Sequence, residues 1–563
     1  MSFQELKERA LAEWDAFSAC GRPRVLVGAG TCGRAAGAED IIQAVNSHLA
    51  GRGLNADVRQ VGCLGLCYAE PLVELSGPAM PRVLYGGLEP DRVPALLDDF
   101  FGRGELREDC ALAVMDGAAA GGIPAFHELP MLRGQVRIVL RNCGLVDPDS
   151  ILHYVARGGY AGLARALQMA PEQVIEEVNR SGLRGRGGVG FPTGRKWESV
   201  RLAAGEPKYV VANAEEGEAG TFKDRMLIEG DPHLLLEGML IAGYAVGASR
   251  GIIFVQANYG LCAERLRRAI DAAEKQGLCG RRILGSGFSF ALSVYNALGG
   301  YVCGEETALL ECLEGRRAIP RAKPPFPAQE GLEGQPTVIN NVETLAGVPA
   351  ILLHGAPSYR ARGTEGSPGT KLFSLSGDLK RPGTVEFPLG VTLRQLIFEA
   401  SGGMPEGRRF RAVLVGGPTG GYVPESYLDL PLDFDSLAPI DAMMGSGAIV
   451  VTDDRTCILD SVIHAARFLA DESCGKCAPC RLGTQQMVRI LHRITTGSGR
   501  PGDPDLLTEL AATLKRSALC GLGQAAGNPV VGSLRHFRAE YQSHIEQALC
   551  PAGVCRLRAA RST

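Results

Sequence analysis

Residues 208–225 read KYVVANAEEGEAGTFKDR, and this stretch decides the fold class. Its first five residues are mostly apolar and predict a short buried strand. The strand is followed at once by Asn213 and by three carboxylates within four positions, Glu215, Glu216 and Glu218. Because α/β folds bind ligands at the carboxyl ends of their strands, we expect a ligand-binding edge here. A solvated acidic turn would have the same composition, so the neighbouring segments must decide between a ligand-binding edge and a solvated turn.

The neighbouring segments favour an α/β centre with a ligand site. A second strand is expected at 251–255 and a helix at 262–275. Upstream, residues 181–196 read SGLRGRGGVGFPTGRK, a glycine density that suits backbone amides approaching a phosphate or a flat ring. Alone, such a loop is equally typical of a mobile surface loop, and it lacks the spacing of a P-loop. Two further polar segments follow, YVCGEETA at 301–308 and NNVET at 340–344.

Four cysteines near the carboxyl end have iron–sulfur spacing. Cys474, Cys477 and Cys480 form C-x2-C-x2-C, and Cys520 follows at a distance. Thiolates at this spacing hold a [4Fe–4S] cluster. A four-thiolate zinc site is the alternative, although such sites usually pair two C-x2-C motifs. The hydrophobic period is helical from residue 460 onward, so we expect the cluster in a helical domain.

Taken together, these segments resemble the flavoprotein subunit of respiratory complex I, which oxidises NADH with FMN. The resemblance covers about residues 136–545 and includes the stretch RAKPPFPA at 321–328, with six motifs in the same order. In layout the chain resembles the diaphorase subunits of NAD(P)-linked hydrogenases, formate dehydrogenases and related soluble complexes. The segments RIVLRNCGLVDPDSI at 137–151 and CGLGQAAGNPVVGSLRHFR at 520–538 favour that branch.

The resemblance implies a set of cofactor contacts. The FMN contacts would be Gly185, Gly187, Gly188, Lys196, Asn213, Glu215, Glu216, Gly304, Glu305, Glu306, Asn340, Asn341 and Thr344. The NAD(P)H contacts would be Phe191, Glu218, Lys323 and Phe326, with Glu218 at the nicotinamide end. Glu215 stands where the family usually has aspartate, and Ser199 replaces an aromatic residue that faces the adenine. Hydride transfer from nicotinamide to flavin needs orientation of the rings rather than a catalytic acid or base.

The N-terminal region resembles a thioredoxin-like [2Fe–2S] ferredoxin with an incomplete ligand set. Cys63 and Cys67 supply its C-x3-C pair, and Cys32 supplies one member of the first pair. The expected partner, five residues before Cys32, is Val27. Cys20 is the nearest substitute, but it precedes the strand and should lie at its wrong end. Two alternatives stay open, a cluster with an unusual fourth ligand and a domain without metal.

The remaining cysteines carry weaker predictions. Cys550 and Cys555 resemble the lead-in to a ferredoxin-like extension of electron-bifurcating relatives, yet the chain ends at Thr563. The others are most simply small buried apolar residues: Cys110, Cys143, Cys262, Cys279, Cys303, Cys312 and Cys457. The nine histidines have no ligand spacing.

Composition limits the remaining possibilities. The formal charge of −3 gives no basic bias toward nucleic acid, and we expect none as a partner. The most apolar stretch, 234–255, is interrupted by Glu237 and Arg250, which favours a buried helix and strand over a membrane span. A polar amino terminus and seventeen cysteines favour a reducing, cytoplasmic location.

The predicted architecture is α/β and multidomain. The expected parts are a thioredoxin-like domain at 1–102, a linker at 103–135, an FMN- and NAD(P)H-binding α/β domain at 136–356, a β-grasp-like SLBB domain at 357–440 and a helical [4Fe–4S] domain at 441–563. The predicted function is that of an NAD(P)H dehydrogenase (diaphorase) subunit. It would exchange electrons with partner subunits, namely a ferredoxin-like or [2Fe–2S] subunit and a dehydrogenase, hydrogenase or reductase. The alternatives are an electron-bifurcating subunit and a non-enzymatic electron-transfer or scaffold subunit.

Overall fold

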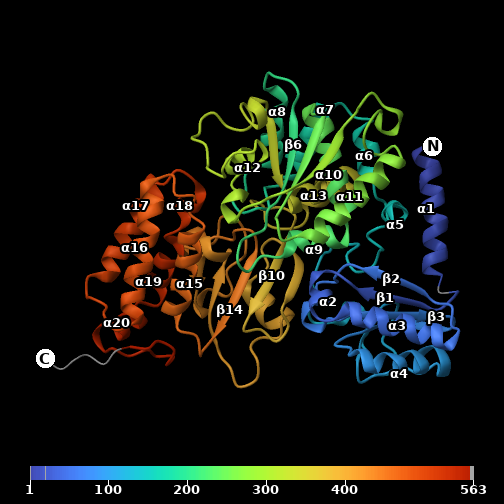
Figure 1. Cartoon of the computed structure of the whole chain (residues 1–563), viewed down its shortest axis with the longest axis horizontal. Coiled ribbons are helices and arrows are strands. Elements are labelled where there is room, and N and C mark those ends of the chain that lie inside the picture. Colours follow the sequence, from blue (N-terminus) through green and yellow to red (C-terminus); the bar gives the residue numbers. More distant parts are fainter. Residues whose placement is uncertain (1, 20, 558–563) are drawn as a thin grey trace.

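Three β-sheets and a set of carboxyl-terminal helices follow one another along the chain (Figure 1). The computed structural model describes residues 2–19 and 21–557, so Cys20 lies outside the described residues. In Figure 1 the first sheet lies at the lower right, the four-stranded sheet above it, and the last helices at the left.

The first sheet has five strands, of which two are parallel and the rest antiparallel. In spatial order they are β2 (Asp57–Val61), β1 (Arg24–Gly28), β3 (Val73–Gly77), β4 (Met80–Tyr85) and β5 (Ala111–Val114). The helices of this region are α1 (Phe3–Ser18), α2 (Thr31–Ala35), α3 (Ala38–Arg52) and α4 (Val93–Leu97). Alternating apolar residues of β1 pack against α3, because Val25 and Val27 share a core with Ile41 and Val45.

The central sheet has four strands, all parallel, as expected for a sheet covered by crossover helices. Its order is β8 (Ala291–Asn296), β7 (Arg250–Val255), β6 (Tyr209–Ala214) and β9 (Thr337–Asn341). The helices around it are α5 (Ile151–Ala156), α6 (Ala161–Ala166), α7 (Pro171–Ser181), α8 (Thr193–Leu202), α9 (Lys223–Gly230), α10 (Pro232–Val246), α11 (Gly260–Lys275), α12 (Glu306–Leu313), α13 (Val342–His354) and α14 (Ala356–Arg360). The strand order reverses between β6 and β9, which makes their carboxyl ends a topological switch point.

The apolar stretch at 234–255 forms a buried helix and a strand, as predicted. Helix α10 is buried along its length, and β7 follows it. The buried Glu237 is satisfied by hydrogen bonds from the amides of Tyr160 (2.8 Å) and Leu163 (3.0 Å) and from the Tyr154 hydroxyl. Among the described residues, no helix is both long and apolar enough to cross a membrane.

The last sheet and the helices complete the molecule. The sheet order is β11 (Gly383–Pro388), β10 (Thr370–Gly377), β14 (Ala448–Asp453), β12 (Phe410–Val415) and β13 (Gly421–Val423). The helices are α15 (Ile458–Asp471), α16 (Ala478–Thr495), α17 (Asp503–Ser517), α18 (Gly521–Ala525), α19 (Asn528–His536) and α20 (Arg538–Glu546). Helix α16 buries Met487, Ile490, Leu491 and Ile494, the spacing of an amphipathic helix.

The predicted domain boundaries stay predictions. Two strands belong to sheets whose other strands lie in a different predicted segment. Strand β5 comes from the predicted linker at 103–135, and it pairs with β4. Strand β14 begins after residue 440, and it lies in the middle of the last sheet. Sequence periodicity missed both because each is a short strand that is completed by distant partners.

The first sheet meets the rest of the chain through close backbone contact. A Cβ atom at Gly62 would lie 2.4 Å from the Cα of Gly230 at the end of α9. A Cβ atom at Gly65 would lie 2.3 Å from the carbonyl oxygen of Thr384 in β11. Only glycine fits at such positions.

Candidate functional site

The switch point brings together the polar segments that the sequence singles out. Asn213 at the end of β6 is in register with Asn341 at the end of β9. The Asn213 amide donates to the carbonyl oxygen of Gly304 (2.9 Å), so the third segment joins the same edge. Asn341 accepts from the amide of Glu343 (3.0 Å) and thereby caps α13. Asn340 is buried and accepts from the indole of Trp197 (2.9 Å).

The glycine-rich loop folds back on itself beside this edge. The amide of Gly185 donates to the carbonyl of Phe191 (2.8 Å), and the amide of Arg186 donates to the Thr344 hydroxyl (2.8 Å). A Cβ atom at Gly187 would lie 2.9 Å from that of Asn341. Gly188 has φ +140°, and the space where a side chain would begin is open. The loop therefore presents bare backbone toward open space, as close approach of a ligand requires.

Two lysines converge on two carboxylates at the start of α12. Glu305 caps the helix by accepting from the amides of Thr307 and Ala308. Glu306 is bound by Lys196 (3.1 Å) and Lys323 (2.6 Å), and Lys323 also binds Glu305 (3.0 Å). Although burial opposes ionisation, the two lysines lower the pKa of Glu306 to about 2. The site thus holds two ammonium groups that can serve a phosphate.

Glu215 and Glu216 have different surroundings although they are neighbours. Both Glu216 oxygens accept backbone amides at the start of α9, from Asp224 (2.7 Å) and Arg225 (2.9 Å). Glu215 accepts from the amide of Gly217 (2.9 Å), and its other oxygen lies 2.6 Å from where a Cβ of Gly304 would be. Burial, aided by repulsion from nearby carboxylates, raises the pKa of Glu215 to about 8.

Glu218 lies between the central sheet and the last sheet. Its carboxylate accepts from the hydroxyls of Thr221 (2.9 Å), Thr419 (3.4 Å) and Ser446. Burial raises the pKa of Glu218 above its ordinary value. The predicted adenine-facing rings are available to a ligand, because Phe191 and Phe326 are 53% and 52% exposed.

A buried charge network under the site was missed by the sequence reasoning. Lys223 binds Asp224 (2.8 Å) and Glu343 (3.0 Å), and Lys371 of β10 binds Glu343 (2.6 Å). All four side chains are at most 4% exposed. The network fastens α9 and α13 to the last sheet. Its members lie in three segments far apart in sequence, so no local pattern marks them.

The four predicted cluster cysteines gather at the ends of helices. Cys474 follows α15, Cys477 caps α16, Cys480 lies inside α16, and Cys520 caps α18. Cys480 is 5% exposed, and Gly523 leaves room beside it, because a Cβ there would lie 3.3 Å from the Cys480 sulfur. Burial, with contributions from Cys477, Cys520 and Cys474, raises the pKa of Cys480 to about 11. The four thiols therefore come from neighbouring helix ends, and four thiolates are a donor set that fits a [4Fe–4S] cluster.

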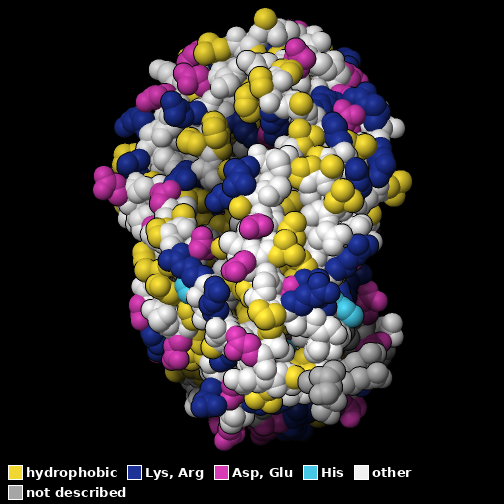
Figure 2. Space-filling model, turned by 90° about the vertical axis from the view of Figure 1, so that its left-hand side faces the viewer, with side chains coloured by type: hydrophobic (Ala, Val, Ile, Leu, Met, Phe, Trp, Pro, Cys, Tyr) yellow, Lys and Arg dark blue, Asp and Glu magenta, His cyan; other side chains and the backbone are white. Residues whose placement is uncertain are grey.

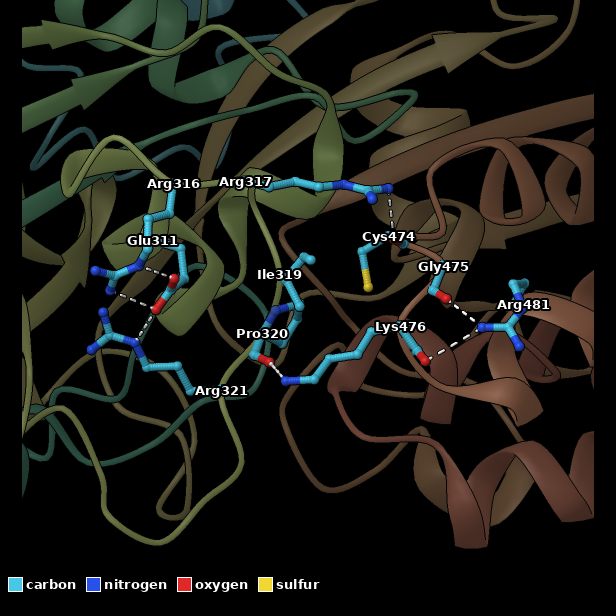
Figure 3. A pocket seen from close by; sticks show the side chains of 10 residues that line it. All are labelled: Glu311, Arg316, Arg317, Ile319, Pro320, Arg321, Cys474, Gly475, Lys476 and Arg481. Atoms are coloured by element: carbon cyan, nitrogen blue, oxygen red, sulfur yellow. Dashed lines mark hydrogen bonds and ion pairs between the residues drawn. The ribbon is translucent and has the colours of Figure 1, made fainter.

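A cavity of about 720 Å³ opens beside Cys474, whose sulfur points into it (Figure 3). Five of its ten lining residues are basic: Arg316, Arg317, Arg321, Lys476 and Arg481. Arg317 donates to the carbonyl of Cys474 (3.1 Å), and Lys476 donates to that of Pro320 (2.9 Å). From the side of the carboxyl-terminal helices, Figure 2 shows a hollow bordered by lysine and arginine side chains.

Among the residues that the structure describes, the N-terminal cysteines do not complete a four-cysteine cluster. Cys63 and Cys67 place their sulfurs 3.9 Å apart, and the Cys32 thiol interacts with that of Cys67. Val27, at the position of the expected fourth cysteine, is fully buried in the apolar core against α3. Its side chain faces away from the thiols, because successive residues of a strand point to opposite faces. The three thiols alone would therefore leave one ligand position of a [2Fe–2S] cluster unfilled.

Another set of metal-ligating residues lies at the carboxyl end. The ligand atoms of Cys457, His544, Cys550 and Cys555 all lie within 4.8 Å of one another. The Cys457 sulfur is 3.5 Å from His544 Nε2 and 3.6 Å from the Cys555 sulfur. Three thiols and one imidazole are the donors of closed, tetrahedral zinc sites. Sequence spacing missed this group because Cys457 stands 87 residues before His544.

Comparison with known proteins decides the family. The model of the Nuo51 FMN-binding domain matches residues 178–350, the SLBB domain 372–423, and the NADH-ubiquinone oxidoreductase-F iron-sulfur binding region 460–544. An F-type subunit of the NADH-quinone oxidoreductase of Rhizobium meliloti is 46% identical over 415 residues, which are 74% of this chain and 99% of that protein. The chain belongs to the family of NADH-quinone oxidoreductase F-type subunits.

Other members of the family support the same assignment. The NADP-reducing hydrogenase subunit HndC of Solidesulfovibrio fructosivorans is 48% identical over 421 residues, 75% of this chain and 86% of that one. The crystal structure of an NAD+-reducing [NiFe]-hydrogenase in the H2-reduced state matches 95% of this chain and 90% of its own, with a TM-score of 0.64 and 29% identity. The chain is therefore a flavoprotein oxidoreductase subunit of the NADH-oxidising type, with an FMN-binding domain and a 4Fe–4S region. Its relatives are subunits of multi-subunit complexes, so it works with partner subunits.

Proposed function

We propose that this chain exchanges hydride between NAD(P)H and FMN and passes single electrons through its [4Fe–4S] cluster to or from a partner redox enzyme in the cytoplasm. The observation that carries this proposal is the contact between the switch point and the cluster loop. Gly300 and Tyr301, just before the switch-point residues Gly304 and Glu305, lie against Glu472 and Phe468, just before Cys474. The nucleotide site and the cluster cysteines are therefore neighbours in the fold, an arrangement that suits direct electron transfer between them.

The chain's own residues bind and orient the nucleotide in this proposal. Lys196 and the bare backbone at Gly188 would hold the FMN phosphate and ring, while Lys323 would bind a nucleotide phosphate. Phe191 and Phe326 would stack on the adenine of the dinucleotide. Glu218 would accept a hydrogen bond from the nicotinamide carboxamide and so keep the two rings stacked. When bound, FMN supplies the chemistry of accepting a hydride and releasing electrons one at a time.

Several contacts hold the cluster loop against the nucleotide site. Tyr301 packs on Phe468 of α15 with ring centroids 5.4 Å apart. A Cβ atom at Gly300 would lie 2.4 Å from a carboxylate oxygen of Glu472, so the two loops touch. The Arg317 and Lys476 hydrogen bonds across the cavity complete this contact. The distance between flavin and cluster is thus set by packing on both sides.

The basic cavity at Cys474 is the proposed exit for electrons. The cation-rich lining would attract an acidic partner surface and steer it toward the exposed edge of the cluster. A ferredoxin-like or [2Fe–2S] subunit is the partner class that suits this edge, with a hydrogenase, dehydrogenase or reductase beyond it. The similarity to HndC, a subunit of an NADP-reducing hydrogenase, and to an NAD+-reducing hydrogenase supports a hydrogenase among the partner enzymes.

The proposal is tested by anaerobic titration of the reconstituted chain with NADH, followed by visible absorbance and low-temperature EPR. Flavin bleaching with a reduced-cluster signal is expected. Glu218→Ala should lower the rate of flavin reduction while FMN stays bound, and Cys477→Ser should leave flavin reduction intact but abolish the [4Fe–4S] signal. If neither NADH nor NADPH bleaches bound flavin, the chain is a passive electron carrier or scaffold and the proposal fails.

The exit is tested with a charge change away from both cofactors. Arg316→Gln, which changes a cavity-lining residue paired with Glu311, should slow reduction of an acidic ferredoxin several-fold and weaken its salt dependence, because one steering charge is lost. Arg394→Gln is the matched control, since Arg394 pairs with Asp429 on the last sheet, outside the cavity. Equal rates for both variants and the unaltered chain would exclude this cavity as the exit.

A further inference from the structure

Cys32, Cys63 and Cys67, the cysteines that the described part of the N-terminal domain brings together, have a buried carboxylate beside them. Glu70 lies three residues after Cys67, at the start of the segment leading to β3. It is 9% exposed, and one of its oxygens accepts from the amide of Leu72 (2.9 Å). The other oxygen is buried and has no hydrogen-bond partner, while the Cys63 thiol is a neighbour of the carboxylate. A buried, half-satisfied carboxylate is costly unless something binds it.

The carboxylate occupies space that another ligand side chain could have filled. A Cβ atom at Gly28, the last residue of β1, would lie 3.0 Å from Glu70 Oε2. A Cβ atom at Gly33 in α2 would lie 3.1 Å from the same oxygen. Glu70 thus lies between β1 and α2. It is on the face of β1 opposite to the Val27 side chain. The carboxylate therefore offers a ligand on the face of β1 that the side chain at position 27 does not reach.

The spacing of the thiols favours a two-iron cluster over a single ion. Two thiolates on one tetrahedral metal, with bonds of about 2.3 Å, lie about 3.8 Å apart. Cys63 and Cys67, at 3.9 Å, match that value. Among the residues that the structure describes, however, Cys32, Cys63 and Cys67 do not form a group whose ligand atoms all lie within 4.8 Å. The three thiols and the carboxylate therefore extend over more than one coordination sphere.

We propose that the N-terminal domain binds a [2Fe–2S] cluster through Cys32, Cys63, Cys67 and the carboxylate of Glu70. The carboxylate takes the place of a fourth thiolate as a hard, anionic oxygen ligand. This inference does not rest on the proposed function, because it concerns a separate site.

The position of this site relates it to the central sheet. Glu229, at the end of α9, accepts from the amide of Thr31 (2.7 Å) beside Cys32. The start of α9 is held by Glu216 at the switch point. The helix has eight residues and is about 12 Å long. The cluster would therefore lie at the far end of a helix that begins at the nucleotide site.

The test compares reconstituted full-length variants. Acid-labile sulfide is counted, because a single metal ion at the carboxyl-terminal cysteine and histidine group would carry none. The unaltered chain should contain about six sulfides, four from the [4Fe–4S] cluster and two from a [2Fe–2S] cluster, with a second EPR signal after dithionite reduction. Glu70→Gln and Glu70→Ala should fall to about four and lose that signal. Glu39→Gln, at an exposed ion pair on α3, is the control that should stay at six.

A rescue variant separates ligation from folding. Gly28→Cys combined with Glu70→Ala places a thiol where the carboxylate now lies, and it should restore about six sulfides with a shifted EPR signal. Retained FMN and [4Fe–4S] signals in each variant report that the chain is folded. Four sulfides in the unaltered chain, zinc in place of iron at this site, or an unchanged second signal in Glu70→Ala would each overturn the proposal.

Discussion

We predict that the carboxyl of Glu215 makes FMN affinity depend on pH and that Glu215→Gln removes that dependence. The group lies beside Gly304, and its pKa is raised to about 8, chiefly by burial. Near pH 7 it is mostly protonated and neutral, so it can donate a hydrogen bond to the ligand. Above pH 8 it becomes a buried anion, which disfavours an anionic ligand in the same site.

The size of the effect follows from the pKa. If FMN binds only the neutral form, the apparent Kd rises by the factor 1 + 10^(pH − pKa). With a pKa of about 8, the factor is roughly 2 at pH 8 and roughly 10 at pH 9. The same proton affects the flavin-free chain. The folded state holds it between about pH 4.5 and about pH 8 while the unfolded state releases it, so the contribution of Glu215 to stability falls as pH rises through that window.

The assay is quenching of FMN fluorescence by the flavin-free chain from pH 6.5 to pH 9. The unaltered chain should bind FMN roughly tenfold more weakly at pH 9 than at pH 6.5. Glu215→Gln, which keeps the shape and stays neutral, should bind with a constant Kd. A flat profile in the unaltered chain, or the same slope in Glu215→Gln, would refute the assignment of Glu215 to the flavin site.

Other substitutions test the loop, the buried charges and the second metal group. Gly188→Ala should lower FMN affinity roughly tenfold, because a side chain is strained at φ +140°. Gly37→Ala, at φ +99° in the first domain, is the control that should leave FMN affinity unchanged. The flavin content of each purified variant is the measurement. Glu343→Gln should cost about 3–5 kcal/mol, because it leaves the buried Lys371 without its carboxylate partner while Lys223 keeps Asp224. Lys371→Met should cost less, because Lys223 still pairs Glu343; hydrogen exchange along β10 measures the difference, and equal protection would contradict it. The unaltered chain should hold about one zinc ion at the carboxyl-terminal cysteine and histidine group. His544→Ala or a chelator should remove this zinc while the [4Fe–4S] signal persists. A full zinc content in His544→Ala would exclude the group as a zinc site.

The parts of the site that could be predicted from sequence are those carried by contiguous motifs. A local requirement marks each of them in the sequence. The glycine loop needs bare backbone, the C-x2-C-x2-C motif needs a fixed distance between thiols, and the carboxylates directly follow β6. Asn213 and Asn341 could be placed at one sheet edge only through family resemblance, because their pairing depends on the strand order. The assignments of individual FMN and nucleotide contacts stay predictions.

The parts that could not be predicted depend on contacts between distant segments. Glu343 and Lys371 meet only when α13 packs against β10, and neither residue stands in a distinctive pattern. His544 joins Cys457 across two helices, so a search for ligand spacing does not find it. Glu70 is three residues from Cys67, yet its role depends on the absence of a side chain at Gly28 on another strand.

The glycine contacts at the base of the first sheet limit how this chain can be re-engineered. Gly62 and Gly65 touch the backbone of α9 and β11 with no room for a side chain. A ferredoxin-like domain transplanted from another protein would keep its register only if it also carried glycine at both positions. The N-terminal domain is therefore not an exchangeable module, and chimeras should be joined elsewhere in the chain.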